Sequence, residues 1–256
     1  MFKTVIRRFL SLISLMAILC LCDTDIKAQS VKDSAISFPI IGIQYSFDVP
    51  AFDLAKSFGV NSTIGASYYR KTASNWLFGI EYNYIFGDVV KINPLDSIST
   101  SQGFIVNNVG QFQELSVYER GHLIMLKVGK IFKNTGHNPN SGLFVKAAAG
   151  FWLHQIFYYW TGNAPPQLSD KYLNGYDRLS YGPALSQSFG YLNFSNSKVF
   201  NLSAELEVAE GVTYNQRAFD YDVRQKDNSA HFDMTIGIKV SWYFPLYNKV
   251  AATYYY

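Results

Sequence analysis

Apolar and polar residues alternate along most of the chain after residue 29, most clearly near the C-terminus. From Phe232 to Phe244 every second residue is apolar, and the residues between them include Asp233 and Lys239. Because side chains on a β-strand point alternately to the two faces of a sheet, this segment is predicted to be a strand with one uncharged face. A strand of this kind suits a wall between lipid and a polar interior.

Seven further segments follow the same period of two. The alternation is clear in 41–49, 76–86, 143–153 and 200–208, and less regular near Val60–Arg70, Leu115–Phe132 and Pro183–Phe194. Several runs exceed the roughly 5–6 residues of a soluble strand and match the roughly 9–11 needed to cross a bilayer. A soluble β-sandwich, whose strands also alternate, is therefore the less favoured alternative.

The segments between these strands alternate in length. Three are short and rich in turn-forming residues, and four are longer. The short ones are Thr72–Asn75, Lys133–Asn140 and Ser195–Ser197, and the long ones are Pro50–Gly59, Gly87–Glu114, Thr161–Gly182 and Tyr214–Asn228. The sequence thus predicts an all-β fold, an antiparallel up-and-down transmembrane β-barrel of about eight strands over residues 38–245, with short periplasmic turns and long external loops.

The N-terminus has the pattern of a signal peptide. Lys3, Arg7 and Arg8 precede the apolar run Phe9–Cys22, and cleavage is predicted after Ala28. The chain is therefore divided into a signal peptide (1–28), a short periplasmic segment (29–37), the barrel and a C-terminal tail (246–256).

Both cysteines lie within the predicted signal peptide. Leu19 and Leu21 precede Cys20 and Cys22, whereas a lipoprotein needs a small residue there, so lipidation is disfavoured. No apolar run of about 18 residues follows Gln29, so no transmembrane helix is predicted in the mature chain. A secreted chain of this kind is either soluble in the periplasm or a closed barrel, and we predict the bacterial outer membrane.

Composition agrees with this interpretation. Charged residues make up 16% of the chain, below the roughly 25% of soluble domains, whereas aromatic residues reach 17%. Aromatic girdles at the two membrane interfaces would account for the excess. The net charge is +3, and no basic cluster occurs beyond the N-terminus, so a nucleic-acid partner is not expected.

Six charged residues are expected to face the lumen, three acids and three lysines. They are Glu81, Lys127, Lys146, Glu205, Glu207 and Lys239. The interior of an eight-stranded barrel is just wide enough for side chains to fill, and buried charges are tolerated when they are paired. We interpret the six as a salt-bridge network that closes the barrel. The alternative, a selectivity ring in a narrow channel, needs more strands.

The sequence predicts no catalytic residue, metal site or cofactor. The four histidines show no metal-ligand spacing. Ser169-Asp170 and Asp177-Arg178 could belong to a Ser-His-Asp site in the outer loops, but no GxSxG motif marks a nucleophile. An outer-membrane enzyme that acts on lipid or peptide at the loop rim remains the alternative to a non-enzymatic barrel.

One long loop is dense in residues that favour protein contacts. Its candidate partner-binding residues are Tyr172, Tyr176, Asp177, Arg178 and Tyr181. The alternative is a loop that folds onto its own barrel rim, with Asp177 and Arg178 paired locally.

The last predicted strand resembles the C-terminal signal by which outer-membrane barrels are recognised for insertion. The residues that carry the resemblance are Gly237, Val240, Trp242 and Phe244. Because residues 245–256 follow them, the signal is either internal or ends at Tyr256. The barrel-insertion machinery is accordingly an expected partner, together with outer-membrane lipids.

Most of the mature chain resembles a family of uncharacterised outer-membrane β-barrel proteins of Bacteroidota. The resembling segments are Pro50–Ser62, Ser74–Gly87, Gly136–Val145, Pro166–Leu192 and Gly237–Tyr247, and the Ala28-Gln29 junction resembles signal cleavage in that phylum. More remotely, the architecture resembles OmpA/OmpX-type barrels and the PorT-like barrels linked to type IX secretion. The resemblance implies the fold and the outer-membrane location, and it implies no settled activity. Our favoured hypothesis is a non-enzymatic barrel that presents its extracellular loops to a secretion or surface complex.

Overall fold

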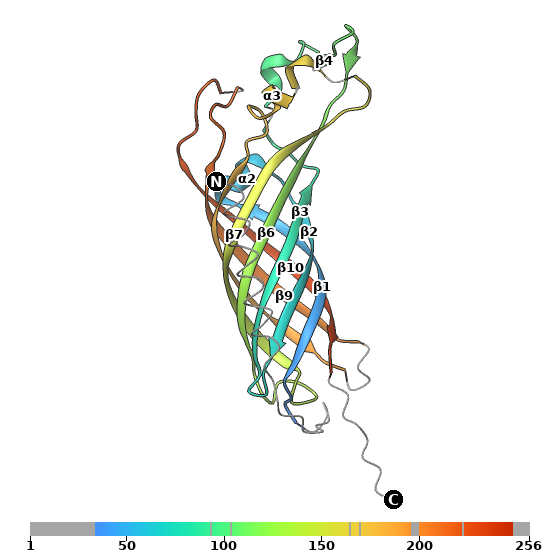
Figure 1. Cartoon of the computed structure of the whole chain (residues 1–256), viewed down its shortest axis with the longest axis vertical. Helices are drawn as coiled ribbons and strands as arrows, with labels where there is room; N and C mark the ends of the chain where they lie inside the picture. Colours follow the sequence, from blue (N-terminus) through green and yellow to red (C-terminus); the bar gives the residue numbers. More distant parts are fainter. Residues whose placement is uncertain are drawn as a thin grey trace, which may run out of the picture. The chain divides into compact units, whose positions relative to one another are not determined.

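Eight long antiparallel strands form a closed ring in which each strand pairs with the next long strand of the chain and the last pairs with the first (Figure 1). The strands are β1 (Phe38–Ala51), β2 (Asn61–Lys71), β3 (Trp76–Gly87), β6 (Ser116–Ile131), β7 (Gly142–Tyr159), β8 (Ser180–Asn193), β9 (Leu202–Asn215) and β10 (Ala230–Pro245). The predicted eight-stranded up-and-down barrel is confirmed.

The computed structural model describes residues 34–247 apart from 93, 103, 164, 169, 196–199 and 222. All of these belong to one compact unit, Ser30–Tyr247. The predicted signal peptide (1–28), the beginning of the predicted periplasmic segment (29–33) and most of the predicted tail (248–256) lie outside the described residues. Among the described residues, no helix has the length and apolar character needed to cross a membrane.

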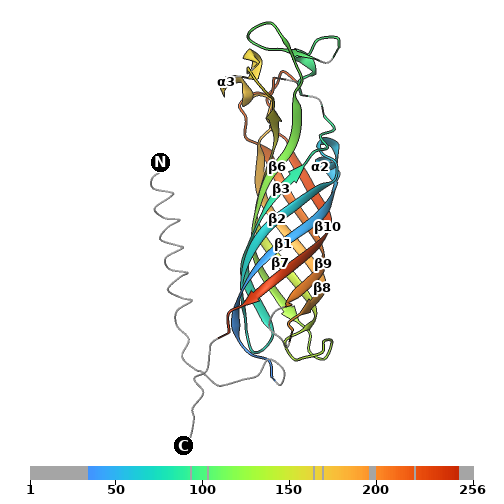
Figure 2. The same cartoon turned by 90° about the vertical axis from the view of Figure 1, so that its right-hand side faces the viewer.

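The strands are staggered as they go round the barrel. If the register is followed from Phe38 through all eight strands, it returns to β1 at Asp48, a shift of ten residues from 38 to 48. A stagger of this size requires strands that tilt by about 40° to the barrel axis, as in small membrane barrels. The tilt is visible in Figures 1 and 2.

The connections differ at the two ends of the barrel. One end, here the turn end, carries the three short connections, and the other, the loop end, carries the four long ones (Figure 1). The long connections contain α2 (Phe52–Ser57), the short helical segments Asp96–Ile98 and Pro166–Leu168, the two-stranded sheet β4 (Ile105–Val106) and β5 (Phe112–Gln113), and α3 (Asp170–Leu173). None of these elements was predicted from the alternation of apolar and polar residues.

Three strands extend by three or more residues further toward the loop end than predicted. β7 continues past Leu153 to Tyr159, β9 continues past Val208 to Asn215, and β8 begins at Ser180 instead of Pro183. Polar residues interrupt the apolar alternation on β7 and β9, but the hydrogen-bonded pairing with neighbouring strands continues. The predicted loop boundaries at Gly182 and Tyr214 were therefore wrong, and Tyr181 lies on a strand.

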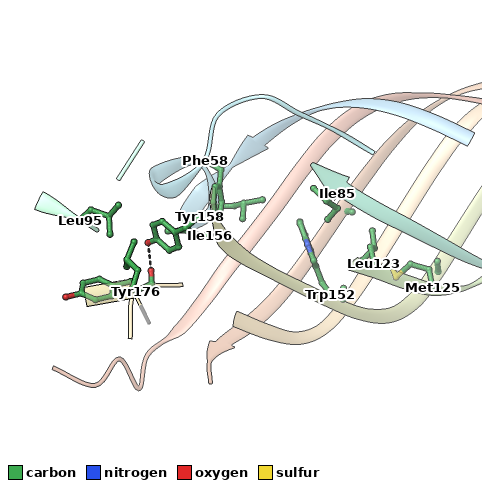
Figure 3. Close-up of a cluster of buried hydrophobic side chains, with 14 of the residues drawn as sticks. Phe58, Ile85, Leu95, Leu123, Met125, Trp152, Ile156, Tyr158 and Tyr176 are labelled. Carbon is green, nitrogen blue, oxygen red and sulfur yellow. Dashed lines mark hydrogen bonds between the residues drawn. The ribbon is translucent and has the colours of Figure 1, made fainter. Parts of the chain in front are cut away.

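Two clusters of buried apolar side chains fill the ends of the lumen. The turn-end cluster consists of Phe38, Ile40, Tyr69, Leu77, Ile131, Phe144, Leu192, Phe194 and Tyr243. The loop-end cluster extends from Met125, Leu123, Ile85 and Trp152 inside the barrel to Phe58, Ile156 and Tyr158 at its mouth and to Leu95 and Tyr176 in the loops (Figure 3). The six inward charges predicted from the sequence lie between these clusters, whereas buried Lys71 lies at the turn end and buried Glu119 and Asp233 lie at the loop end.

Candidate functional site

Four of the six charged lumen residues form one cluster, called the central ring here. Lys127 Nζ lies 2.6 Å from Glu207 Oε2 and 3.2 Å from Glu81 Oε1. Lys239 Nζ lies 2.8 Å from Glu207 Oε2 and 2.5 Å from Glu81 Oε1. Each lysine therefore bridges both carboxylates, and all four side chains are buried. Water cannot solvate these buried charges, and the two cations and two anions compensate one another instead.

The other two charged residues form a separate pair. Lys146 Nζ lies 2.7 Å from Glu205 Oε2, which also accepts a hydrogen bond from Ser188 Oγ at 2.9 Å. The Lys146 ammonium lies 4.7 Å and 5.4 Å from the ring centroids of Phe144 and Tyr69, within cation–π range. All six residues are thus inside the barrel, but as a ring and a pair instead of one continuous network.

Neutral side chains complete the hydrogen bonds of the central ring. Tyr69 Oη donates to Glu81 Oε2 at 2.9 Å, and Asn83 Nδ2 donates to Glu81 Oε1 at 2.8 Å. Asn83 Oδ1 in turn accepts from Gln44 Nε2 at 3.0 Å. These three residues were not among the predicted lumen residues, although the period of two on β1, β2 and β3 places them on the inward face.

The lumen around the central ring is densely filled. The cavity that borders Asn83, Glu207, Lys239 and Trp152 has a volume of about 20 Å³, which is close to the size of a single water molecule. Side chains therefore occupy most of the interior at this level, as expected for eight strands.

The turn end is closed by aromatic packing and by the segment that precedes β1. Phe38 contacts Phe194 edge-on at 5.2 Å between ring centroids. Asn140 Oδ1 accepts from Ile36 N at 3.0 Å and from Lys71 Nζ at 2.8 Å, and Asn140 Nδ2 donates to the Ser34 carbonyl at 2.9 Å. These bonds attach residues 34–36 to the turn between β6 and β7.

Helix α2 lies at the loop-end mouth of the barrel (Figure 2). Its Leu54 is buried, and so is Phe58, which follows the helix and packs edge-on against the His154 ring at 5.8 Å. Asp53 Oδ2 accepts from the backbone N–H of Phe232 at 2.8 Å and so attaches α2 to β10. Hydrogen bonds from Lys56 and from this N–H lower the pKa of Asp53 below its usual value.

The outer face of the barrel is apolar over most of its height. On β6 the outward-facing residues between Arg120 and Lys130 are His122, Ile124, Leu126 and Val128. The two charged residues are ten positions apart, from 120 to 130. At a rise of about 3.3 Å per residue and a tilt of about 40°, they are separated by about 25 Å along the barrel axis. This equals the apolar band of a membrane barrel, about 25 Å.

Both of these charged residues pack on aromatic rings at the edges of the band. The Lys130 ammonium lies 4.8 Å from the Trp76 ring centroid. The Arg120 guanidinium lies 5.0 Å from the Tyr118 ring and 5.6 Å from the Phe157 ring. Aromatic residues paired with cations in this way are typical of the interface between lipid tails and headgroups.

A larger cavity of about 300 Å³ opens at the loop end and borders two histidines. His154 Nε2 lies 2.9 Å from Asp233 Oδ2, and the nearby Ser180 Oγ donates to the Arg178 carbonyl. The second histidine, His231, contacts Asp227 Oδ2 at 2.7 Å and Ser229 Oγ at 3.3 Å through the same nitrogen, Nε2.

Neither arrangement is a catalytic triad, because a triad engages the two ring nitrogens of histidine separately, one with the acid and one with the nucleophile. Among the described residues, no group of three or more His, Cys, Asp or Glu side chains could hold a metal ion. The other histidines contact Tyr82 Oη (His122) and Asn138 (His137).

The candidate partner loop is divided between the surface and the interior. Tyr172 is 53% exposed, whereas Tyr176 and Asp177 are each 7% exposed. Asp177 forms a bidentate ion pair with Arg217 of the β9–β10 loop instead of the local pair with Arg178 considered above. Tyr181 lies on the outer face of β8, 5.3 Å from Phe151 between ring centroids.

Tyr172 and Tyr176 line an open hollow of about 370 Å³ together with Tyr221. The Tyr221 ring lies 6.2 Å from Tyr172 and 5.4 Å from Tyr176 between centroids. Tyr158 Oη donates to the Tyr176 carbonyl at 2.8 Å and so links the loop to β7 (Figure 3).

The residues of the proposed insertion signal lie on β10, which pairs with β1 and closes the barrel. Val240, Trp242 and Phe244 face outward, and Gly237 faces inward opposite Asp48. A side chain at position 237 would collide with the Asp48 carboxylate, since a Cβ there would lie 1.8 Å from Asp48 Oδ1. Glycine at this position therefore has a packing role in the described fold.

No protein-family model matches this chain, and no curated protein sequence matches it. Among solved structures, Ail, the attachment invasion locus protein of Yersinia pestis, is 7% identical with a TM-score of 0.41, and the match covers 82% of this chain and 99% of Ail. OprG of Pseudomonas aeruginosa is 12% identical (TM-score 0.34; 84% and 99% covered), and the N-terminal β-barrel domain of P. aeruginosa OprF is 11% identical (TM-score 0.33; 79% and 97% covered). These identities and TM-scores are low, so the description of the barrel rests on the strand pairing within this chain.

Proposed function

We propose that this protein is an integral β-barrel of a bacterial outer membrane, with a closed lumen, whose loop end binds a partner outside the cell. The observation that carries the proposal is the predominantly apolar outer band of about 25 Å between Arg120 and Lys130, combined with a charged interior. A soluble barrel would have the reverse arrangement, with its apolar side chains inside.

Membrane fractionation tests the location. The processed protein is expected in the outer-membrane fraction and is expected to resist extraction with alkaline carbonate. Recovery of the processed protein in the soluble periplasmic fraction would refute the proposal.

Three layers support a closed lumen over the narrow-channel alternative: the turn-end cluster, the charged side chains, and the loop-end cluster with α2. Ions cannot pass through side chains packed at this density. The purified protein in planar bilayers is expected to show no stable single-channel conductance. Stable conductance of the wild type would favour the channel.

The loop end supports a binding role because of its exposed aromatic residues. Tyr172 and Tyr221 line an open hollow, and tyrosine is enriched where proteins bind partners. We propose this hollow as the docking point for a secretion or surface complex. The enzymatic alternative has no comparable support, since both histidine clusters lack a positioned nucleophile.

Co-purification from solubilised outer membranes tests the binding role. Tyr172→Ala is expected to remove the co-purifying partner. Tyr159→Ala is a matched control, because Tyr159 is also 53% exposed but lies on β7 outside the hollow. Equal recovery of the partner with both variants would exclude the hollow as the docking point.

The insertion role of Gly237, Val240, Trp242 and Phe244 also stays a proposal. It is supported by their position on the closing strand, with three apolar side chains facing outward.

A further inference from the structure

One of the polar pairs in the apolar band of the outer wall contains a carboxylate. Gln187 on β8 and Glu210 on β9 both face outward, and Gln187 Nε2 donates to Glu210 Oε1 at 2.8 Å. Glu210 is the one carboxylate among the outward-facing strand residues that the structure describes. Gln187 is the eighth residue of the 14-residue strand β8, so its side chain lies near the middle of the wall.

This position is unfavourable in lipid. An amide has two N–H donors and an acceptor oxygen, and the bond to Glu210 uses one donor. Lipid tails offer no hydrogen-bond partner for the second N–H and the oxygen of the amide, and lipid headgroups do not reach the middle of the wall. Two other outward polar side chains in the band bond to outward tyrosines: Ser62 bonds to Tyr45 Oη, and His122 bonds to Tyr82 Oη.

We propose that the outer face of β8 and β9 is an interface within the membrane with a second copy of this chain. The inference rests on the proposed membrane location and goes beyond the proposed partner-binding role. Across a two-fold axis parallel to the barrel axis, the two Gln187 amides face each other at the same depth. Each amide then donates its second N–H to the oxygen of the other, which satisfies both.

The surroundings of Gln187 suit close approach. Ala147 lies directly opposite Gln187 on β7, and Val208 lies directly opposite it on β9. A small residue beside a polar one allows two backbones to come near, as in membrane helix pairs. The flanking outward residues, Leu185, Phe189 and Leu206, are apolar and over half exposed, so they can pack against the same residues of the second copy.

Disulfide cross-linking in outer membranes tests the interface. The described residues contain no cysteine, and the wild type serves as the control for Cys20 and Cys22 of the predicted signal peptide. Val208→Cys is expected to give a cross-linked dimer under mild oxidation. Ile64→Cys is the matched control, because it faces outward on β2, which lies four strands from β8 in the ring. It is expected to give no dimer.

A second substitution tests the role of the amide. In the Val208→Cys background, Gln187→Leu keeps the size of the side chain and removes the hydrogen bonds of the amide, and heat-modifiable gel mobility checks that this variant still folds. Loss of the dimer is the expected result. The inference is overturned if the dimer survives this change, if Ile64→Cys cross-links equally, or if Val208→Cys cross-links only to a different protein or to nothing. If the variants and the wild type are all absent from the membrane fraction, the proposed location is overturned together with the dimer. If the protein is a membrane-embedded monomer, only the dimer is overturned.

Discussion

At the scale of single residues, the lumen shows how a barrel interior can hold full charges. Lys127 and Lys239 each contact both Glu81 and Glu207, so no charge in the central ring depends on a single partner. Lys146 and Glu205 instead form a two-member unit. Removal of one partner from such a buried pair leaves the other charge uncompensated.

The Lys146–Glu205 pair therefore allows a clean double-mutant cycle. Lys146→Met and Glu205→Gln are each expected to lower the free energy of unfolding by about 3–5 kcal/mol, and the double variant is expected to lose less than the sum. Urea unfolding followed by tryptophan fluorescence measures the three values. Lys56→Met is the control, because its pair with Asp53 is on the surface and contributes about 0–1 kcal/mol. Strict additivity of the two lumen substitutions would contradict the pairing.

Asp227 gives a prediction about pH at the loop end. Its partial burial favours the neutral form, but hydrogen bonds from Ser229 and His231 outweigh this effect and lower the pKa of Asp227 below its usual value. A depressed pKa means that the carboxylate stabilises the loop above pH about 4 and that this contribution is lost as pH falls through the lower value in the folded state. Hydrogen exchange of the Ser229 amide should stay protected at pH 5. If the Ser229 amide loses its protection between pH 6 and pH 5, the hydrogen bond between Ser229 and Asp227 is contradicted.

At the scale of strands, β10 shows how alternation encodes the two faces of the wall. Lys239, Ser241 and Asp233 point inward, whereas Ile238 lies near the middle of the outer face and Phe244 lies near its turn end. The cost of a charge on the lipid face depends on depth, because lipid tails cannot solvate it and headgroups can.

The same substitution at two depths tests this arrangement. Ile238→Lys is expected to lower stability by about 2–4 kcal/mol, and Phe244→Lys by about 0–1 kcal/mol. Heat-modifiable gel mobility and urea unfolding in lipid vesicles both report the difference. Equal losses at the two positions would show that the apolar face of β10 does not lie across a membrane.

The strands and the inward charges could be predicted because both depend on local alternation. A period of two assigns Glu81, Lys127 and Lys146 to one face without knowledge of any neighbour. The pairing of these charges could not be predicted, because it depends on the stagger of ten residues round the barrel. That stagger places Lys146 beside Glu205, and it places Glu81 beside Lys127 and Lys239.

The loop-end packing was missed for a different reason. Helix α2 has six residues, and Leu54 and Phe58 are buried only because they meet side chains from β7 and the other loops. No local pattern marks such contacts. In the same way, the Asp177–Arg217 pair joins residues 40 positions apart, so the loop sequence alone suggested Arg178.

At the scale of the whole molecule, the barrel has an inverted distribution of polarity. Its wall exposes apolar side chains, its middle is charged and paired, and both ends of its lumen are packed with apolar clusters. In the proposed location a lipid bilayer would stabilise the wall, and the ion pairs and clusters stabilise the interior. These features together support the proposed membrane-embedded barrel with a filled lumen.

A spin-label scan along β10 tests this central claim most directly. Single cysteines at positions 235, 236, 238, 240 and 241 carry a nitroxide in reconstituted vesicles, and relaxation by oxygen and by a water-soluble paramagnetic complex is measured. Labels at 236, 238 and 240 are expected to be accessible to oxygen, which concentrates in lipid, and not to the water-soluble complex. Labels at 235 and 241, which replace small inward-facing side chains, are expected to be accessible to neither. Access of the water-soluble complex to 236, 238 and 240 would contradict the membrane location, and its access to the odd-numbered positions would contradict the filled lumen.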